Sequence, residues 1–158
     1  MPVERDHFFQ LMASFASGVT VVTCKDAEGM RRGFTASAFT SLSLEPRLCL
    51  VSVDNRSESL PVMRETGVFV VNILSDTQEH VSRTFASKAP DRFAEIPHRD
   101  GPATGAPIID GALAHVECRV HEMLAGGDHT IVVGAIQDGA ANEGAPLLYF
   151  RGQYRELA

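Results

Sequence analysis

The feature that most constrains this chain is a succession of short, β-branched apolar segments with no regular helical pattern between them. They occupy residues 18–24, 47–53, 68–74, 113–124 and 129–136, and Gly, Pro or Asp punctuates the sequence between them. Parallel neighbouring strands need a crossover connection, usually a helix, so a doubly wound parallel sheet does not fit this order. Six or seven strands with few helices predict a mostly β fold, an antiparallel barrel.

Helical patterns are confined to three short stretches. Apolar residues recur at helical spacing in residues 4–16. Ser59-Leu60-Pro61 predicts the start of a second helix that ends before Gly67. The run Ser75-Asp76-Thr77-Gln78 has the spacing of a capping box, which predicts a third helix through about Phe85.

The remaining segments fill out the strand pattern. Residues 33–37 and 147–150 are expected to be strands, whereas residues 87–111 are expected to be irregular, with a short helical turn at 91–94. Residues 113–124 alternate in polarity, which predicts a strand with one wet face. The predicted inward residues are Val116, Cys118 and Val120, and the predicted outward residues are His115, Glu117, Arg119 and His121.

Size, charge and cysteine content narrow the functional classes. The 158 residues contain no internal repeat or linker, so we expect a single domain over residues 1–158. A net charge of -6 argues against a nucleic-acid partner. No apolar run is long enough for a membrane helix and no leader is evident, so we expect a cytoplasmic protein. The separated Cys24, Cys49 and Cys118 are expected to be buried free thiols.

The common catalytic motifs are absent. The sequence has no GxGxxG or GxxxxGK[ST] phosphate loop, no HExxH and no GxSxG. The six histidines are not spaced as a metal site, so no metal is expected. A metal-dependent enzyme that uses the distant His115, His121 and His129 is the alternative that elemental analysis would test.

A dense hydroxyl run follows the second predicted strand. Its small residues let a ligand approach the backbone, and its hydroxyl and amide groups can hold a phosphate or a ribityl chain. The alternative is a strand and turn whose hydroxyls satisfy their own backbone. The candidate residues are Thr35, Ala36, Ser37, Ala38, Phe39, Thr40, Ser41 and Ser43.

Two strand ends carry further candidates. In Gly126-Gly127-Asp128-His129-Thr130 the glycines allow a tight turn, and His129 could stack on or hydrogen-bond to an aromatic ligand. Asn55-Arg56-Ser57 follows a strand, where an Arg beside a hydroxyl suits a phosphate. The alternatives are a solvent-facing histidine and an ordinary surface turn.

Two aromatic segments are weaker candidates. Phe85-Ala86-Ser87 and Arg92-Phe93 could cover a flat ligand, although such rings more often belong to a core. Residues 149–154 read as a terminal aromatic strand that packs on the body.

The order of these segments resembles that of the short-chain flavin reductases, the reductase components of two-component flavin-dependent monooxygenases. The resemblance covers nearly the whole chain. It is carried by residues 15–23, 33–46 and 69–74, by Gly127-Asp128-His129-Thr130 and by residues 148–154.

The resemblance implies an antiparallel split β-barrel of the FMN-binding type with a few short flanking helices, and a homodimer. It implies an NAD(P)H:flavin oxidoreductase that passes a hydride from NADH or NADPH to FMN or FAD and supplies a partner monooxygenase. By family pattern the residues from Thr35 to Ser43 line the flavin. Its phosphate or adenylate lies near Ser52, Asn55, Arg56 and Ser57, Phe85 and Ala86 flank the cofactor, and His129 lies where the nicotinamide docks.

Two alternatives share the implied barrel. One is a non-enzymatic flavin-binding protein or electron carrier, which would not oxidise NAD(P)H. The other is an oxidase of the pyridoxamine-phosphate type, which would turn over its substrate without a nicotinamide.

Overall fold

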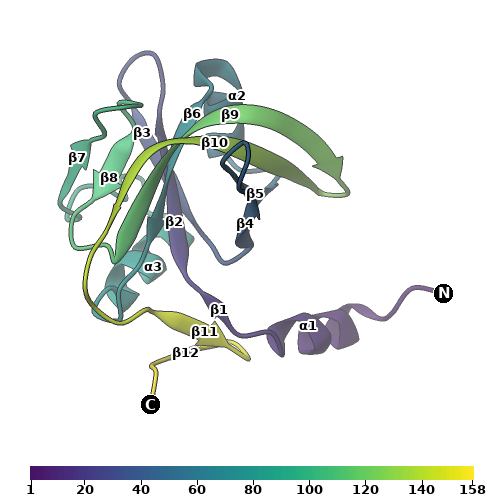
Figure 1. The fold of residues 1–158 in the computed structure, drawn as a ribbon. Coiled ribbons are helices and arrows are strands. Elements are labelled where there is room, and N and C mark those ends of the chain that lie inside the picture. Colours follow the sequence, from purple (N-terminus) through teal and green to yellow (C-terminus); the bar gives the residue numbers. More distant parts are fainter.

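A curved seven-stranded antiparallel sheet dominates the computed structural model, which describes all residues from Met1 to Ala158 (Figure 1). The strand order is β3-β2-β6-β9-β10-β5-β4. The sheet coils so strongly that β3 contacts β5, although four strands lie between them in the sheet order. Its strands are β2 (Thr20–Lys25), β3 (Arg31–Ala36), β4 (Phe39–Ser43), β5 (Leu48–Asp54), β6 (Val68–Ile73), β9 (Ala114–Gly126) and β10 (His129–Ala141).

Two smaller sheets flank the main one. One is a three-stranded sheet of β1 (Ser17–Gly18), β11 (Leu148–Phe150) and β12 (Gln153–Arg155). The strand expected at residues 147–150 is confirmed, but the single strand expected over residues 149–154 is a hairpin that turns at Arg151 and Gly152. The segment expected to be irregular contains β7 (His98–Asp100) paired with β8 (Pro107–Ile109). That expectation was therefore wrong for six residues, because strands of three residues leave no readable alternation.

The three predicted helices are present; the second has the predicted bounds, and the first and third are shorter than predicted. α1 (Arg5–Ala13) buries none of its residues and stands away from the barrel in Figure 1. α2 (Ser59–Thr66) ends at Gly67, whose φ of 70° is the left-handed conformation expected of a glycine cap. α3 (Glu79–Ala86) begins later than expected.

The predicted capping box before α3 forms only in part. Gln78 Oε1 accepts a hydrogen bond from the Ser75 amide at 3.0 Å, which is one half of the motif. The Ser75 hydroxyl instead bonds the Thr77 hydroxyl at 3.0 Å, so the other half is missing. Ser75 therefore forms a turn with Thr77 and Gln78 instead of capping the helix, and α3 starts after this turn, at Glu79.

The alternation of β9 was interpreted correctly for its inner face and wrongly for Glu117. Cys118 is buried, and Val116 and Val120 pack against the same core cluster. On the opposite face Arg119 and His121 are exposed, but Glu117 is 0% exposed. The loop between β7 and β8 covers Glu117, and its carboxylate accepts bonds from Ala103 N (3.1 Å), Thr104 N (2.9 Å) and Thr104 Oγ1 (2.7 Å).

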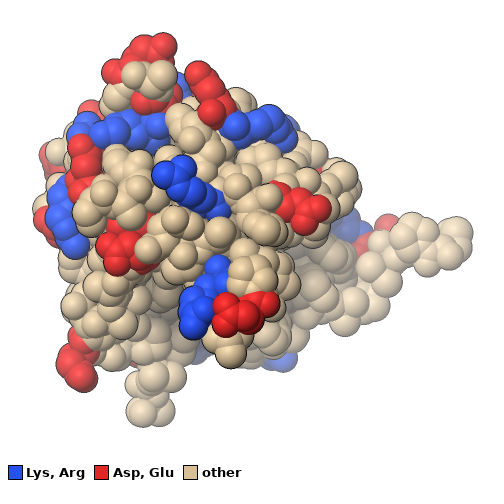
Figure 2. All heavy atoms as spheres, turned by 45° about the horizontal axis from the view of Figure 1, so that its top comes forward, with Lys and Arg blue, Asp and Glu red and all other residues tan.

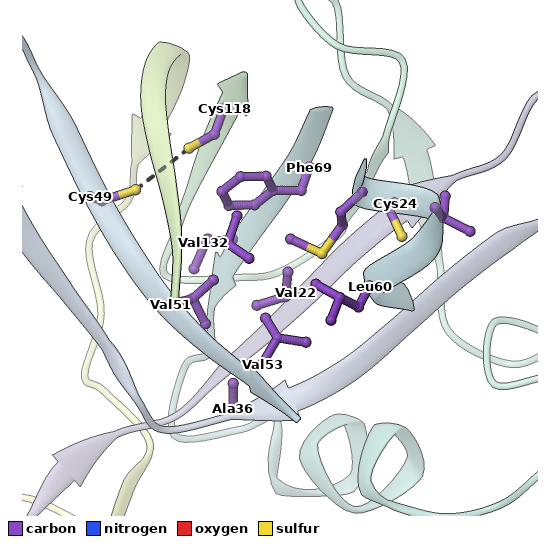
Figure 3. Packing of buried hydrophobic residues seen from close by; sticks show 13 residues of the cluster. Val22, Cys24, Ala36, Cys49, Val51, Val53, Leu60, Phe69, Cys118 and Val132 are labelled. Atoms are coloured by element: carbon purple, nitrogen blue, oxygen red, sulfur yellow. Dashed lines mark hydrogen bonds between the residues drawn. The ribbon is translucent and has the colours of Figure 1, made fainter. Parts of the chain in front are cut away.

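In the barrel core, Phe69 and Cys118 pack closely against Gly134 of β10. Figure 3 shows Cys49 and Cys118 approaching each other beside Phe69, with 3.6 Å between the two sulfur atoms. A Cβ on Gly134 would lie 2.6 Å from the Phe69 ring and 2.9 Å from Cys118 Cβ, so only glycine leaves room for this packing. All three cysteines are buried and unbridged, as predicted.

None of the three helices combines the length and the apolar character that crossing a membrane requires.

Candidate functional site

The hydroxyl run forms the end of β3, a two-residue connection and β4. The run was expected to follow a strand, but Phe39–Ser43 is itself a strand paired with β5. In the connection the carbonyls are already bonded: Ser37 O accepts from Phe39 N and Ala38 O accepts from Ser52 N, both at 3.0 Å. The Ala36 carbonyl accepts from the Thr20 hydroxyl at 2.6 Å.

The backbone amides of Ser37 and Ala38 therefore stand out. Neither N–H has an acceptor within the chain, and both residues are exposed. Two adjacent free donors next to a strand end can bind a carbonyl or an anion. Phe39 N–H does not share this property, because it is bonded to Ser37 O.

The side-chain hydroxyls of the run divide into two groups. Thr35 Oγ1 donates to Ser82 O at 2.6 Å, which ties β3 to α3, and Thr40 Oγ1 donates to Ser41 O at 3.2 Å. These two satisfy neighbouring backbone, as the alternative interpretation expected. Ser37 and Ser41 are exposed and make no bond through their hydroxyls.

A second cluster forms where β5 ends and β10 begins. His129 pairs with Asp54 across the two strands. Asn55 N donates to Asp128 O at 3.0 Å, and the Thr130 hydroxyl donates to Asn55 Oδ1 at 2.6 Å. The structure thus brings the predicted Asn55 and His129 together, although they lie far apart in the sequence.

His129 has a defined tautomer in this cluster. Its Nδ1 lies 2.7 Å from Asp128 Oδ1, and a carboxylate only accepts, so Nδ1 carries the proton. The Nε2 of the neutral ring is then an acceptor. The side chain is 43% exposed, so that acceptor is accessible to a ligand.

Arg56 is held by Asp54. Its Nε and Nη2 lie 3.2 and 3.0 Å from the two carboxylate oxygens, and its amide donates to Oδ1 at 2.8 Å. The hydrogen bonds from Arg56 lower the pKa of Asp54 to about 2. The two bonds to Asp54 orient the guanidinium. Because the Arg56 side chain is 90% exposed, its remaining N–H groups are accessible to a ligand.

Strand β5 connects the hydroxyl run with the cluster around Asn55 and His129. The Ser52 amide donates to Ala38 O in the hydroxyl run, and the turn that contains Asn55, Arg56 and Ser57 begins three residues after Ser52. Ser41 and Ser43 pair with Cys49 and Leu48 at the other end of β5. At about 3.3 Å per residue this end is roughly 20 Å from Asn55, so the predicted residues do not all converge on one point.

Phe85 lies in the core. Its side chain is 1% exposed, its ring stacks edge-on against Phe93 at 4.9 Å, and it packs against Gly33. Its ring packs against β3 at Gly33, while the adjacent Ala86 is exposed. The core alternative named for this aromatic pair is what the structure shows.

A cavity of about 1130 Å³ adjoins the turn after β5. The β2–β3 hairpin, the turn before α2 and residues 88–94 enclose it, and Arg56 and Ser57 belong to its wall. Arg31, Arg32 and Lys88 also line it. Sequence reasoning missed these three residues, and the adjacent arginines at 31 and 32 were the available signal.

No group of three or more His, Cys, Asp or Glu side chains is placed to hold a metal ion.

A family model described as a flavin reductase like domain matches residues 12–158, which is nearly the whole chain. The chain belongs to the flavin reductase-like family. It is 42% identical to the reductase component of 4-hydroxyphenylacetate 3-monooxygenase from Thermus thermophilus, over 97% of both chains. It is 40% identical to an NADH-dependent flavin reductase from a Rhodococcus species, over 96% of this chain and 85% of the relative.

Solved structures of the flavin reductase-like family confirm the fold class. An NADH:FAD oxidoreductase of Streptomyces globisporus, solved with NAD and FAD fragments, superposes with a TM-score of 0.92 at 34% identity and covers 100% of this chain and 97% of that one. The expected mostly β, antiparallel split barrel with short flanking helices is therefore confirmed. The relatives are reductases, which favours the enzymatic interpretation over a flavin carrier.

The site of this flavin reductase-like chain fits a flavin nucleotide on its own geometry. The free Ser37 and Ala38 amides supply donors for a ring carbonyl. The Asn55-Arg56-Ser57 turn supplies an oriented guanidinium for a phosphate. Strand β5 connects the two groups, because its Ser52 amide donates to Ala38 O three residues before Asn55.

Proposed function

We propose that this chain is an NADH-dependent flavin reductase that delivers reduced FMN or FAD to a partner monooxygenase. The observation that carries the proposal is the pairing of two free backbone donors at Ser37 and Ala38 with the arginine-bearing turn at Asn55–Ser57. Relatives at 40–42% identity are named as an NADH-dependent flavin reductase and a monooxygenase reductase component, which supports both the donor and the partner.

The backbone carries most of the flavin binding in this proposal. Ser37 and Ala38 donate to the ring, and the free Ser37 hydroxyl is available to the polar chain that follows it. Ser52, Asn55, Arg56 and Ser57 hold the phosphate. Donors fixed in a strand connection need no reorganisation when negative charge develops on the ring, so they favour its reduced form.

His129 positions the nicotinamide. When bound, the flavin supplies the acceptor for the hydride, so the protein needs no strong acid or nucleophile. Asp128 holds the proton on Nδ1, which leaves Nε2 to accept a hydrogen bond from the carboxamide of the nicotinamide. Alignment of the two rings is then the main contribution of this residue.

The exposed helix α1 supports a homodimer. Phe8, Phe9, Leu11 and Met12 are 47–58% exposed, and Phe15 just after the helix is 81% exposed. Leu42 and Leu44, at the end of the hydroxyl run, are 49% and 77% exposed. Such apolar surface is costly to leave in water, so we infer that a second copy covers it and that the whole chain acts as one domain.

A steady-state assay tests the proposed activity. Purified protein is mixed with NADH or NADPH and with FMN or FAD, and nicotinamide oxidation is followed by absorbance. We expect oxidation that depends on added flavin and is faster with NADH than with NADPH. Flavin binding without any oxidation would instead support a carrier, and substrate oxidation without a nicotinamide would support the pyridoxamine-phosphate type of oxidase.

A further inference from the structure

Strand β3, which leads into the free amides of Ser37 and Ala38, is an edge strand. It is first in the order of the main sheet, so it forms ladder hydrogen bonds along one side only, to β2. An edge strand lacks the second row of ladder bonds that holds a central strand, so packing against its face contributes more to its position. The placement of the two amides therefore depends on the element that covers β3.

Helix α3 covers β3 close to these amides. Thr35, two residues before Ser37, donates from its hydroxyl to Ser82 O at 2.6 Å, which is the side-chain hydrogen bond between the helix and the strand. Phe85 of the same helix packs against Gly33, two residues earlier on β3. The end of β3 is thus fixed to α3, and a shift of the helix would move the strand.

Ser82 also binds the C-terminal hairpin. Its hydroxyl lies 2.7 Å from the hydroxyl of Tyr154, which belongs to β12, and Ser82 is completely buried. The half-buried Tyr154 ring lies under the guanidinium of Arg83 at 4.8 Å and edge-on to the ring of Tyr149 at 5.2 Å. Ser82 is therefore bonded on one side to β3 and on the other to a tyrosine whose ring is itself held in place.

Ionic contacts do not duplicate these two hydrogen bonds. Figure 2 brings the top of Figure 1 forward and shows Lys and Arg gathered on that face, with Asp and Glu between them, whereas β12 lies at the bottom of Figure 1. No ion pair joins α3 to β3 or to β12. The polar contacts that orient α3 between β12 and β3 are therefore those of Ser82.

We propose that Tyr154 is a positioning residue for the flavin. Its hydroxyl fixes Ser82 and with it α3, and the Ser82 carbonyl fixes Thr35 at the end of β3. The amides of Ser37 and Ala38 are thereby held in the geometry that binds the ring. The inference rests on the proposed function, because these amides are its ring donors. Tyr154 acts through Ser82 and Thr35 and not by contact with the flavin.

The reduced flavin should depend on this contact more than the oxidised flavin does. Negative charge develops on the ring during reduction, and hydrogen bonds to a charged acceptor are about twice as strong as neutral ones. Donors stabilise such charge best when they are already held in place. Loosening the end of β3 should therefore weaken the binding of reduced flavin more than that of oxidised flavin, which a purely structural contact would not do.

Anaerobic titration calorimetry with oxidised and with reduced flavin tests the proposal, using whichever of FMN and FAD the wild type binds more tightly. Tyr154→Phe removes the hydroxyl and keeps the ring, and Ser82→Ala removes the other half of the same bond while its carbonyl still accepts from Thr35. Tyr149→Phe is the matched control, because this neighbouring tyrosine is 38% exposed and its hydroxyl has no partner in the chain. Urea unfolding of each variant reports stability separately.

We expect Tyr154→Phe to raise the dissociation constant about threefold for oxidised flavin and about tenfold for reduced flavin. Ser82→Ala should do the same, and the double variant should be no weaker than either single variant, because both remove one bond. Tyr149→Phe should match the wild type.

A loss of unfolding stability in Tyr154→Phe with both dissociation constants unchanged would make the contact structural only and overturn the proposal, while the proposed function stands. Additive losses in the double variant would overturn it as well. If the wild type bound neither flavin, the proposed function itself would fail.

Discussion

Single contacts decide what the site residues can do, and Asp54 is an example. Its hydrogen bonds from Arg56 lower its pKa to about 2. A carboxyl with a depressed pKa in the folded state stabilises the fold above its ordinary pKa of 3.8, and that contribution is lost as the pH falls through about 2. The pair therefore stays intact, and Arg56 stays oriented, throughout the neutral range.

An NMR titration of the Asp54 carboxyl carbon should find a midpoint near 2 in the wild type. In Arg56→Ala the midpoint should return toward the ordinary value of 3.8, because the bonds that favour the charged form are gone. A midpoint near the ordinary value in the wild type would show that the ion pair does not form in solution.

His129 should matter for the nicotinamide and little for the flavin. In His129→Ala the acceptor at Nε2 is lost, and we expect the KM for NADH to rise on the order of tenfold with the flavin dissociation constant unchanged. His121→Ala, which removes an exposed histidine from the neighbouring strand β9, is the control. Unchanged reduction kinetics in His129→Ala would refute the positioning role.

Gly134 should tolerate no side chain. An added Cβ would lie 2.6 Å from the Phe69 ring, and overpacking a core costs about 1–3 kcal/mol of unfolding free energy. Gly134→Ala should lose that amount in urea unfolding. Gly18→Ala, whose Cβ meets nothing within 4 Å, should be close to neutral, and equal losses in both variants would contradict the packing account.

For single residues, the sequence shows which side chains are present but not which of their hydrogen-bonding groups remain free in the fold. The run from Thr35 to Ser43 is visible as small and polar. Only the structure shows that the Thr35 hydroxyl is used by Ser82 while the Ser37 and Ala38 amides are free. Long-range bonds made this distinction, and they leave no local pattern in the sequence.

Among the secondary-structure elements, the loop between β7 and β8 is anchored by one buried carboxylate. Glu117 accepts bonds from Ala103 and Thr104, and a Cβ on Gly101 would clash with its side chain. Removing this buried acceptor would leave the half-buried Thr104 amide and hydroxyl and the Ala103 amide without their partner.

Glu117→Ala should therefore destabilise the fold by about 3 kcal/mol in urea unfolding. Hydrogen exchange at the Ala103 and Thr104 amides should also speed up. Glu122→Ala, an exposed carboxylate on the same strand, is the control and should stay near wild type. Slow exchange at both amides in Glu117→Ala would show that another contact holds the loop.

Helices and strands were predicted correctly from the sequence where neighbouring residues alone determine them. The apolar strands and the Gly67 cap of α2 follow from nearby residues. Glu117 was assigned to a wet face because alternation reports polarity, and the β7–β8 segment that covers it is distant in sequence. Phe39–Ser43 reads as a polar run, and only pairing with β5 makes it a strand.

For the whole molecule, α1 is the part that the barrel does not explain. It buries no residue against its own chain, and it projects from the body in Figure 1. A helix of nine residues is too short to be stable alone in water, so its apolar surface needs a partner.

Deletion of residues 1–13 should convert a dimer into a monomer in analytical ultracentrifugation, while the β-sheet circular dichroism signal is retained. The family resemblance predicted the dimer, whereas composition and spacing alone did not. A full-length chain that sediments as a monomer at micromolar concentration would contradict the inferred interface.

A crystal structure of the chain with bound FAD tests the central claim most directly. We predict the flavin ring within hydrogen-bonding distance of the Ser37 and Ala38 amides, with its first phosphate at the Asn55–Ser57 turn. A flavin bound on any other surface, with both amides facing only water, would contradict the account.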